Sequence, residues 1–409
     1  MADATILHAA SVTANTATSA TWVEAVSIAA GSFTVGRDYV LIAVLNLDSS
    51  AGTSDCGYRF VHGTTPTEFT DAVGHMDPVS SDEARPQIFI QRFTQPNPAE
   101  AVTLQFNLRE GTGTITQMYA DIIAFDITAD WTENTNFFWD EDTGDTADAA
   151  TLTARAAITF SANGTDKWLI AGQASWNVAT TGVAFAMCLN DSVGPTKYGD
   201  STPLGYPSQD TDDLFNFGYL VGLTPTNGSH TFSVLTQSAT TEAVLSSRIV
   251  AFNLTALFQD VAIAYTAAAD NPTADGTTWE TEQSLSVTPT ATGNFVIFAN
   301  AVASIAAAGD NCLARLQINP DGGGLVSDPA YGDDGPDNFA SSISRGMPFE
   351  LQTVRSLTTG AARPINFDWK QASGGTSAVR ERALIAFSVA KAGAPPPVVV
   401  KTLAALGVG

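Results

Sequence analysis

The sequence predicts an all-β protein made of three tandem antiparallel β-sandwich domains of the jelly-roll type, followed by an extended C-terminal arm. Three observations lead to this prediction. A similar strand-like segment with an Ala-Phe pair occurs three times. Short segments alternate apolar and polar residues, and turn residues recur about every ten positions. No segment keeps the apolar period of an amphipathic helix, which argues against a helical architecture.

Each copy closes on a strand-like phrase that contains an Ala-Phe pair. The phrases begin at Asp121, Arg248 and Ala383, and their Ala-Phe pairs begin at residues 124, 251 and 386. Successive copies are therefore 127 and 135 residues apart. This period is far longer than a solenoid repeat, so each copy is expected to be a whole domain.

Further strands recur in the same order inside each copy. An early apolar strand follows a turn at residues 39–43, 167–171 and 295–299. One cysteine comes shortly after each of these strands, at Cys56, Cys188 and Cys312. A cysteine that recurs once per copy is expected to be a small buried residue and not a reactive thiol.

Turn-rich stretches between the copies set the expected boundaries. The acidic stretch 140–148 is the expected first linker, and 267–275 is the expected second junction. The prediction is an N-terminal segment at 1–13, sandwich copies at 14–132, 143–258 and 270–391, and a proline-hinged arm at 392–409.

Charge and composition narrow the function classes. Forty-two Asp and Glu face 18 Lys and Arg, for a net charge of −24. A field of that sign repels nucleic acid and anionic lipid, so neither a nucleic-acid nor a membrane partner is expected. The first twenty residues carry no Lys or Arg and no apolar core of a signal peptide, which predicts synthesis in a cytoplasm.

The sequence contains no group of residues that indicates a particular catalytic reaction. The four histidines occupy different places in the copies, and no HExxH, nucleophile elbow or phosphate-binding loop is present. We therefore expect no catalytic residues, no cofactor and no enzyme activity. A carboxylate pair for glycoside hydrolysis stays open, because 42 acidic residues without known geometry cannot test it.

Calcium is the one ligand with some support in the sequence. Two loops group hard oxygen donors of the kind that calcium prefers, although neither fits the EF-hand frame. The candidate ligands are Asp140, Asp142 and Asp145 in the first loop, and Asp333, Asp334 and Asp337 in the second. The alternative is that these acidic loops are simply solvated.

An aromatic cluster marks the first junction. It consists of Trp131, Phe137, Phe138 and Trp139. We expect these side chains to pack between the first and second copies, and stacking on a sugar is the alternative.

The C-terminal tail is interpreted as an assembly arm. A triple proline gives a stiff polyproline segment, and an apolar stretch follows it. Such a short apolar stretch cannot fold alone, so it is expected to dock on this chain or on a neighbour. The residues of the proposed arm are Pro395, Pro396, Pro397, Val398, Val399, Val400, Leu403 and Leu406.

Deleting residues 395–409 tests the arm. The truncated chain should melt at nearly the same temperature as the full chain, because the tail is outside the three predicted cores. It should be incorporated less well into its assembly. Calorimetry and a co-sedimentation assay measure the two effects, and normal incorporation of the truncated chain would rule the arm out.

The whole pattern resembles structural proteins of tailed-bacteriophage virions, namely capsid decoration proteins, head fibres and tail fibres. The shared features are tandem β-sandwiches, strands rich in Ala, Thr, Ser and Gly, acidity, and a short terminal arm. This resemblance implies a virion location, with other virion proteins or copies of the chain as partners. The alternative is a carbohydrate-binding adhesin of a bacterial surface, for which a host-surface glycan would be the partner.

Overall fold

The structure is a computed structural model, and it describes residues 3–392 with internal gaps. The gaps are at 12, 52–53, 77–82, 145, 149, 179–184, 195, 200–213, 241, 268–270, 274–277, 306–311, 328–346 and 372–376. The predicted arm at residues 393–409 and the predicted calcium ligands Asp145, Asp333, Asp334 and Asp337 therefore lie outside the described residues.

Strands dominate the described chain and fall into three consecutive units. Unit 1 contains β1 (Ile6–Ser11), β2 (Thr16–Ala17), β3 (Val23–Ile28), the short 3-10 helix η1 (Ala30–Ser32), β4 (Asp38–Ser49), β5 (Asp55–His62), β6 (Thr67–Met76), β7 (Glu83–Thr94), β8 (Val102–Glu110) and β9 (Ile115–Asp126). Unit 2 contains β10 (Phe137–Asp142), β11 (Thr146–Ala147), β12 (Thr153–Ala162), β13 (Trp168–Asn177), β14 (Phe185–Asp191), β15 (Thr196–Gly199), β16 (Leu214–Leu223), β17 (Gly228–Ser238) and β18 (Ala243–Asn253). Unit 3 contains β19 (Val261–Thr266), β20 (Asn271–Thr273), β21 (Glu280–Val287), β22 (Gly293–Ile305), β23 (Cys312–Ile318), β24 (Val326–Ser327), β25 (Met347–Leu357), β26 (Arg363–Gln371) and β27 (Ser377–Ser388). The helices α1 (Ile127–Asp130) and α2 (Leu254–Leu257) follow units 1 and 2.

Every unit is a sandwich of two antiparallel sheets with one shared strand order. In unit 1 the first sheet runs β1-β9-β4-β7 and the second runs β3-β8-β5-β6. Units 2 and 3 repeat this order strand for strand. Eight strands in two such sheets form a jelly roll, so the predicted fold class is confirmed.

The units begin earlier than the sequence suggested. β1, β10 and β19 each pair with the closing strand of their own unit, through contacts such as Ile6 with Phe125. The expected N-terminal segment therefore contains β1, the end of β10 lies in the expected acidic linker, and β19 lies before the expected start of the third copy at 270. This correction has a physical cause: β10 lies at the edge of its sheet, where the acidic side chains of Asp140 and Asp142 are tolerated.

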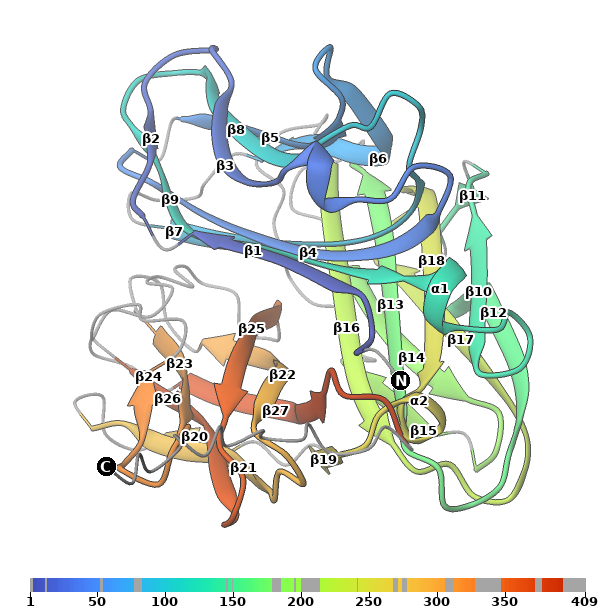
Figure 1. The fold of residues 1–409 in the computed structure, drawn as a ribbon. Helices are drawn as coiled ribbons and strands as arrows, with labels where there is room; N and C mark the ends of the chain where they lie inside the picture. Colours follow the sequence, from blue (N-terminus) through green and yellow to red (C-terminus); the bar gives the residue numbers. More distant parts are fainter. Residues whose placement is uncertain are drawn as a thin grey trace, which may run out of the picture.

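The three units close into a ring around an approximate threefold axis. Figure 1 shows unit 1 in blue to teal, unit 2 in green to yellow and unit 3 in orange to red, with α1 and α2 near the place where the units meet. The equivalent strands β7, β16 and β25 contact one another at this axis. One continuous hydrophobic cluster includes buried residues of all three units. The sheet that contains β7, β16 or β25 is called the axial sheet of its unit.

Candidate functional site

The candidate functional site is the junction where the three axial sheets meet. Three phenylalanines at equivalent positions, one from each closing phrase, gather there. The Phe125 ring lies 5.1 Å from the Phe252 ring and 6.3 Å from the Phe387 ring, measured between centroids. All three side chains are almost completely buried. The residue that identifies the repeat is therefore also the residue that joins its copies.

The connections between units extend this aromatic junction. Asp126 and Asn253 cap α1 and α2 by accepting a hydrogen bond from the backbone three residues later. Each short helix then delivers an aromatic ring to the next unit. Trp131 packs 4.7 Å from Phe252, and Phe258 packs 4.6 Å from Phe387. The two linkers therefore pack into the shared core.

The ends of the described chain complete the ring. The backbone N–H of Ala4 in unit 1 donates to the carbonyl of Val389 after unit 3, at 2.9 Å. The ammonium of Lys391 pairs with Asp130 of α1 at 2.5 Å. These contacts give unit 3 and unit 1 an interface even though no linker joins them directly.

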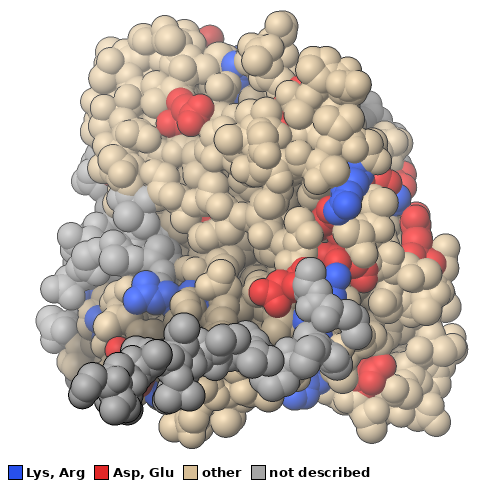
Figure 2. All heavy atoms as spheres, in the orientation of Figure 1, with Lys and Arg blue, Asp and Glu red and all other residues tan. Residues whose placement is uncertain are grey.

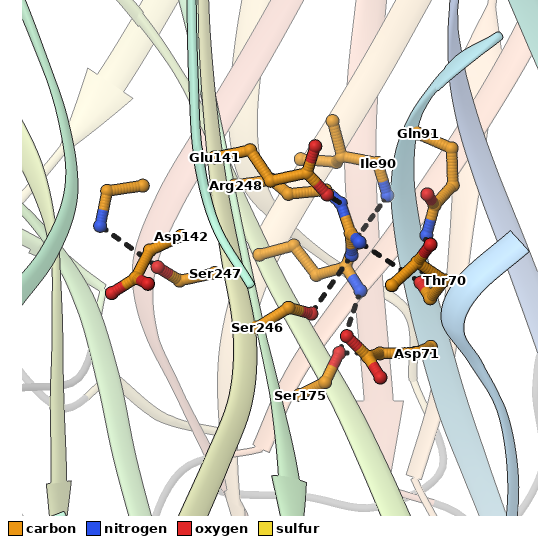
Figure 3. A network of polar contacts seen from close by, with 12 residues as sticks. Thr70, Asp71, Ile90, Gln91, Glu141, Asp142, Ser175, Ser246, Ser247 and Arg248 are labelled. Carbon is orange, nitrogen blue, oxygen red and sulfur yellow. Dashed lines mark hydrogen bonds and ion pairs between the residues drawn. The ribbon is translucent and has the colours of Figure 1, made fainter. Parts of the chain in front are cut away.

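A buried arginine connects units 1 and 2. Arg248 of β18 is 1% exposed, and its guanidinium donates to Glu141 at 2.6 Å and to Ser246 at 3.1 Å. It also donates to the carbonyl of Thr70 in unit 1 at 3.0 Å, as Figure 3 shows. Burial lowers the pKa of Arg248, and Glu141 opposes that shift. Because its donors bond to groups of both units, Arg248 fixes the orientation of unit 2 relative to unit 1.

Amide side chains complete the contact between units 1 and 2. Gln173 accepts from the backbone N–H of Ile90 at 2.5 Å. Gln87 accepts from the backbone N–H of Asn216 at 2.9 Å, and the Asn216 amide donates to the Tyr58 hydroxyl at 3.2 Å. Because these groups are buried, each hydrogen bond offsets the loss of hydration of its two groups. If the units packed in another register, the same groups would be buried without partners.

Units 2 and 3 meet through small residues and tyrosines. Gly222 lies against Ile263 and Ile385, where a Cβ would come within 2.7 Å of Ile263. The Tyr219 hydroxyl of unit 2 donates to the Glu381 carbonyl of unit 3 at 2.9 Å, and within unit 3 the Tyr265 hydroxyl donates to the carboxylate of the same Glu381. Burial raises the pKa of Tyr219 well above its ordinary value. These phenols therefore remain donors across the neutral range.

A glutamine of β25 makes several of the polar contacts between units 3 and 1. The Gln352 side chain donates to Asp121 at 2.8 Å and to the carbonyl of Ile42 at 3.2 Å. The Tyr119 hydroxyl donates to the Gln352 carbonyl and accepts from the Gln352 backbone N–H. Asp121 also pairs with His8 at 2.8 Å. Burial raises the pKa of Asp121, and His8 partly offsets that rise.

Glu350 is the unusual group at this interface. Its side chain is buried, and neither carboxylate oxygen has a hydrogen-bond partner among the described residues. Burial and then the charge of Asp121 raise its pKa well above the ordinary value. An acid whose pKa is higher in the folded state contributes stability at low pH and loses it as the pH rises through the folded pKa.

Replacing Glu350 by Gln should therefore stabilise the chain, and more so at high pH. We expect a gain of about 1–3 kcal/mol near pH 8, because an unpaired buried carboxylate disappears. The gain should shrink toward pH 5. Asp121, Tyr119 and His8 face the same region. The wild type and the Glu350→Gln variant both contain them, so the difference between the two proteins reports Glu350. Urea unfolding at pH 5, 6.5 and 8, in buffers that contain a chelator of divalent cations, measures the difference, and a difference that does not change with pH would contradict this assignment.

The predicted calcium loops do not form a recognisable centre in the described residues. Asp140 and Asp142 lie on the edge strand β10, where Asp140 accepts from the Ala157 backbone N–H and Asp142 from Gly144. Within the described ranges, no group of three His, Cys, Asp or Glu side chains is placed to hold a metal. Backbone bonds of this kind fit the alternative that these acids are structural or solvated.

The histidines whose side chains are described are each paired with a carboxylate. His8 pairs with Asp121, His62 with Glu100, and His230 with Asp191. These pairs lie in different places, so they do not combine into one site. Cys56 and Cys188 are buried on equivalent strands, which agrees with the expected packing role. The side chain of Cys312 lies outside the described residues.

Of the aromatic cluster at the first junction, Trp131 packs between units 1 and 2 as expected, whereas Phe137 and Phe138 belong to β10 and pack inside unit 2. Trp131 and Phe137 both contact Phe252 of unit 2, and Phe138 packs against Phe160 and Trp168. A shallow pocket of about 440 Å³ borders this cluster. Its lining is Asn134, Thr135, Phe138, Thr159, Phe160, Ser161 and Ser229.

The fold defines a class of protein: a chain of three jelly rolls closed around a pseudo-threefold axis. No family model matches this chain, and no curated protein matches it. Among solved structures it is similar to one described as the triple jelly roll fold and turret assembly in an archaeal virus. That match has 10% identity, covers 93% of this chain and 90% of the other, and has a TM-score of 0.18.

Two further solved structures are of different kinds. The VP2 subviral particle of infectious bursal disease virus has 9% identity over 96% of this chain and 83% of its own, with a TM-score of 0.21. A tandem CBM22 domain of Xyn10C from Paenibacillus barcinonensis has 11% identity over 63% of this chain and 94% of its own, with a TM-score of 0.19. Likenesses at these scores carry no argument about function.

Among the described residues, no helix is long and apolar enough to cross a bilayer.

Proposed function

We propose that the chain is a non-enzymatic structural protein of a virion surface, and specifically of a tailed bacteriophage, as a capsid decoration protein, head fibre or tail fibre. The observation that supports this proposal is the closed ring of three jelly rolls with one buried junction. Such a chain places three related scaffolds rigidly around one axis. It therefore presents threefold-like contact surfaces to neighbouring proteins without having to assemble a trimer first.

The surface chemistry is compatible with this role. On the face in Figure 2, most of the described surface comes from uncharged residues, and the charged side chains lie in small groups, several of which combine acidic and basic residues. Several polar groups of the buried junction hold the units together, as Arg248 does through the Thr70 carbonyl and Gln352 through Asp121. Other virion proteins or copies of this chain fit a face of this kind, which is mostly uncharged although the whole chain has a net charge of −24.

Co-purification with particles tests the proposal. The full chain should sediment with intact virions from an infected culture and should stay with them through a high-salt wash. Mass spectrometry of the gradient fractions detects it. Recovery of the chain only in soluble or cell-envelope fractions would sink the virion assignment.

A carbohydrate-binding adhesin is the second candidate, and the pocket beside Phe138 favours it. Hydroxyl and amide groups line the pocket together with two phenylalanine rings, which is a chemistry that neutral sugars accept. A glycan array with the full chain distinguishes the candidates. A virion protein that acts only in assembly leaves the array blank, whereas an adhesin binds a defined glycan class.

A further inference from the structure

Unpartnered oxygen atoms gather in the buried seam between unit 3 and unit 1. Among the described residues, both carboxylate oxygens of Glu350 and the amide oxygen of Gln352 have no hydrogen-bond partner. The amide oxygen of Asn46 also has no hydrogen-bond partner among the described residues. The three side chains are 2%, 0% and 2% exposed, respectively. Buried oxygens without donors normally indicate something that satisfies them.

The strand geometry directs these groups to one place. Gln352 faces unit 1, because its side chain donates to Asp121. Glu350 lies two residues earlier on β25, so its side chain leaves the same face of the strand. In unit 1, Asn46 lies opposite Tyr119 in the register of β4 and β9, and the Tyr119 hydroxyl contacts the Gln352 backbone.

The seam contains more acceptors than donors. The amide nitrogen of Asn46 is one unsatisfied donor, against four unsatisfied oxygens of Asn46, Gln352 and Glu350. Asp121 adds a further buried carboxylate, and His8 is its basic partner. Two carboxylates in a dry interface are costly unless a cation or protons balance them. Carboxylate and amide oxygens together are ligands for a hard cation, and calcium tolerates such an irregular set better than magnesium does.

We propose that the seam between units 3 and 1 binds one calcium ion through Glu350, Gln352 and Asn46, with Asp121 beside it. This site is separate from the acidic loops, and it does not depend on a virion role. Because no linker joins unit 3 to unit 1 directly, an ion held by residues of both would strengthen the contact that closes the ring.

Refolding with and without calcium tests the site. The full chain is unfolded in urea, refolded with calcium chloride or with a chelator, and dialysed. We expect the wild-type chain to retain one calcium per molecule by elemental analysis and to melt several degrees higher than the chelated form. The increase should be smaller at pH 5 than at pH 8, because protons compete for the carboxylates.

Two variants decide the outcome. E350Q keeps the shape of the side chain and should fold, as circular dichroism will show, but it should retain no calcium and gain no melting temperature from it. D142N changes a partly exposed acid on the edge strand β10, away from the seam, and should behave like the wild type. The proposal would be overturned if the refolded wild type held no calcium or if E350Q retained it. It would also be overturned if only D142N lost its bound calcium.

Discussion

A valine in place of Gly218 should destabilise the protein by about 3 kcal/mol, because it forces a side chain into the pseudo-threefold axis. A Cβ at this position would lie 2.4 Å from Cγ2 and 2.9 Å from Cβ of Ile88 in unit 1. Ile88 is fully buried and branched at Cβ, so it cannot rotate away at little cost. The clash therefore separates β16 from β7. Urea unfolding measures the loss.

A matched glycine provides the control. Gly293 also lies in a strand, β22, but a Cβ there meets nothing within 4 Å. Gly293→Ala should change the stability by less than about 0.5 kcal/mol. Trimming Ile88 to Ala should make Gly218→Ala less harmful than it is alone, which a double-mutant cycle detects. Equal and small effects of the Gly218 and Gly293 substitutions would show that the units do not touch at this point.

Truncation of Phe252 to Ala should cost about 3–5 kcal/mol, the range for a large buried aromatic. Its ring packs against Phe125, Trp131 and Phe137, at 5.1, 4.7 and 5.3 Å between centroids. The substitution would leave a cavity at the junction of units 1 and 2. Side chains of one unit cannot fill this cavity without moving relative to the other unit. Urea unfolding gives the free energy, and the emission of Trp131 should shift to the red as water reaches its ring.

The exposed residue Val35 serves as the comparison. Its side chain is 45% exposed, so Val35→Ala should leave both the stability and the emission nearly unchanged. Phe125→Ala and Phe252→Ala should also be non-additive by about 1 kcal/mol, since the two rings contact each other. Additive losses would place the two rings in separate cores and contradict the shared junction.

The sequence contained a readable sign of the junction. The stretch 39–45 and the stretch 122–125 are continuously apolar, without the alternation expected of a strand that has one face in water. Both faces of β4 and β9 are indeed buried, one in unit 1 and the other at the axis. The repeated Ala-Phe phrase therefore indicated more than a shared core. It also marked the surface by which the copies meet.

Other parts of the site left no such sign. Glu350 lies on a strand with a mixed pattern, and its partners Gln352, Asp121 and Asn46 come from distant parts of the chain. The Arg248 bridge pairs β18 with β10, a strand whose acidic sequence reads as a linker. A run of local residues cannot specify contacts that form only after three separate sheets have packed.

The sequence by itself determined the local and repeated features of this protein. Alternation, turn residues and the spacing of the Ala-Phe phrase define strands, sandwiches and three copies, because these depend on neighbours along the chain. Only the tertiary structure decided that the copies close into a ring, where each unit truly begins, and which polar groups are buried at the axis. Those outcomes depend on how sheets far apart in the sequence exclude water between them, and that free energy belongs to no single segment.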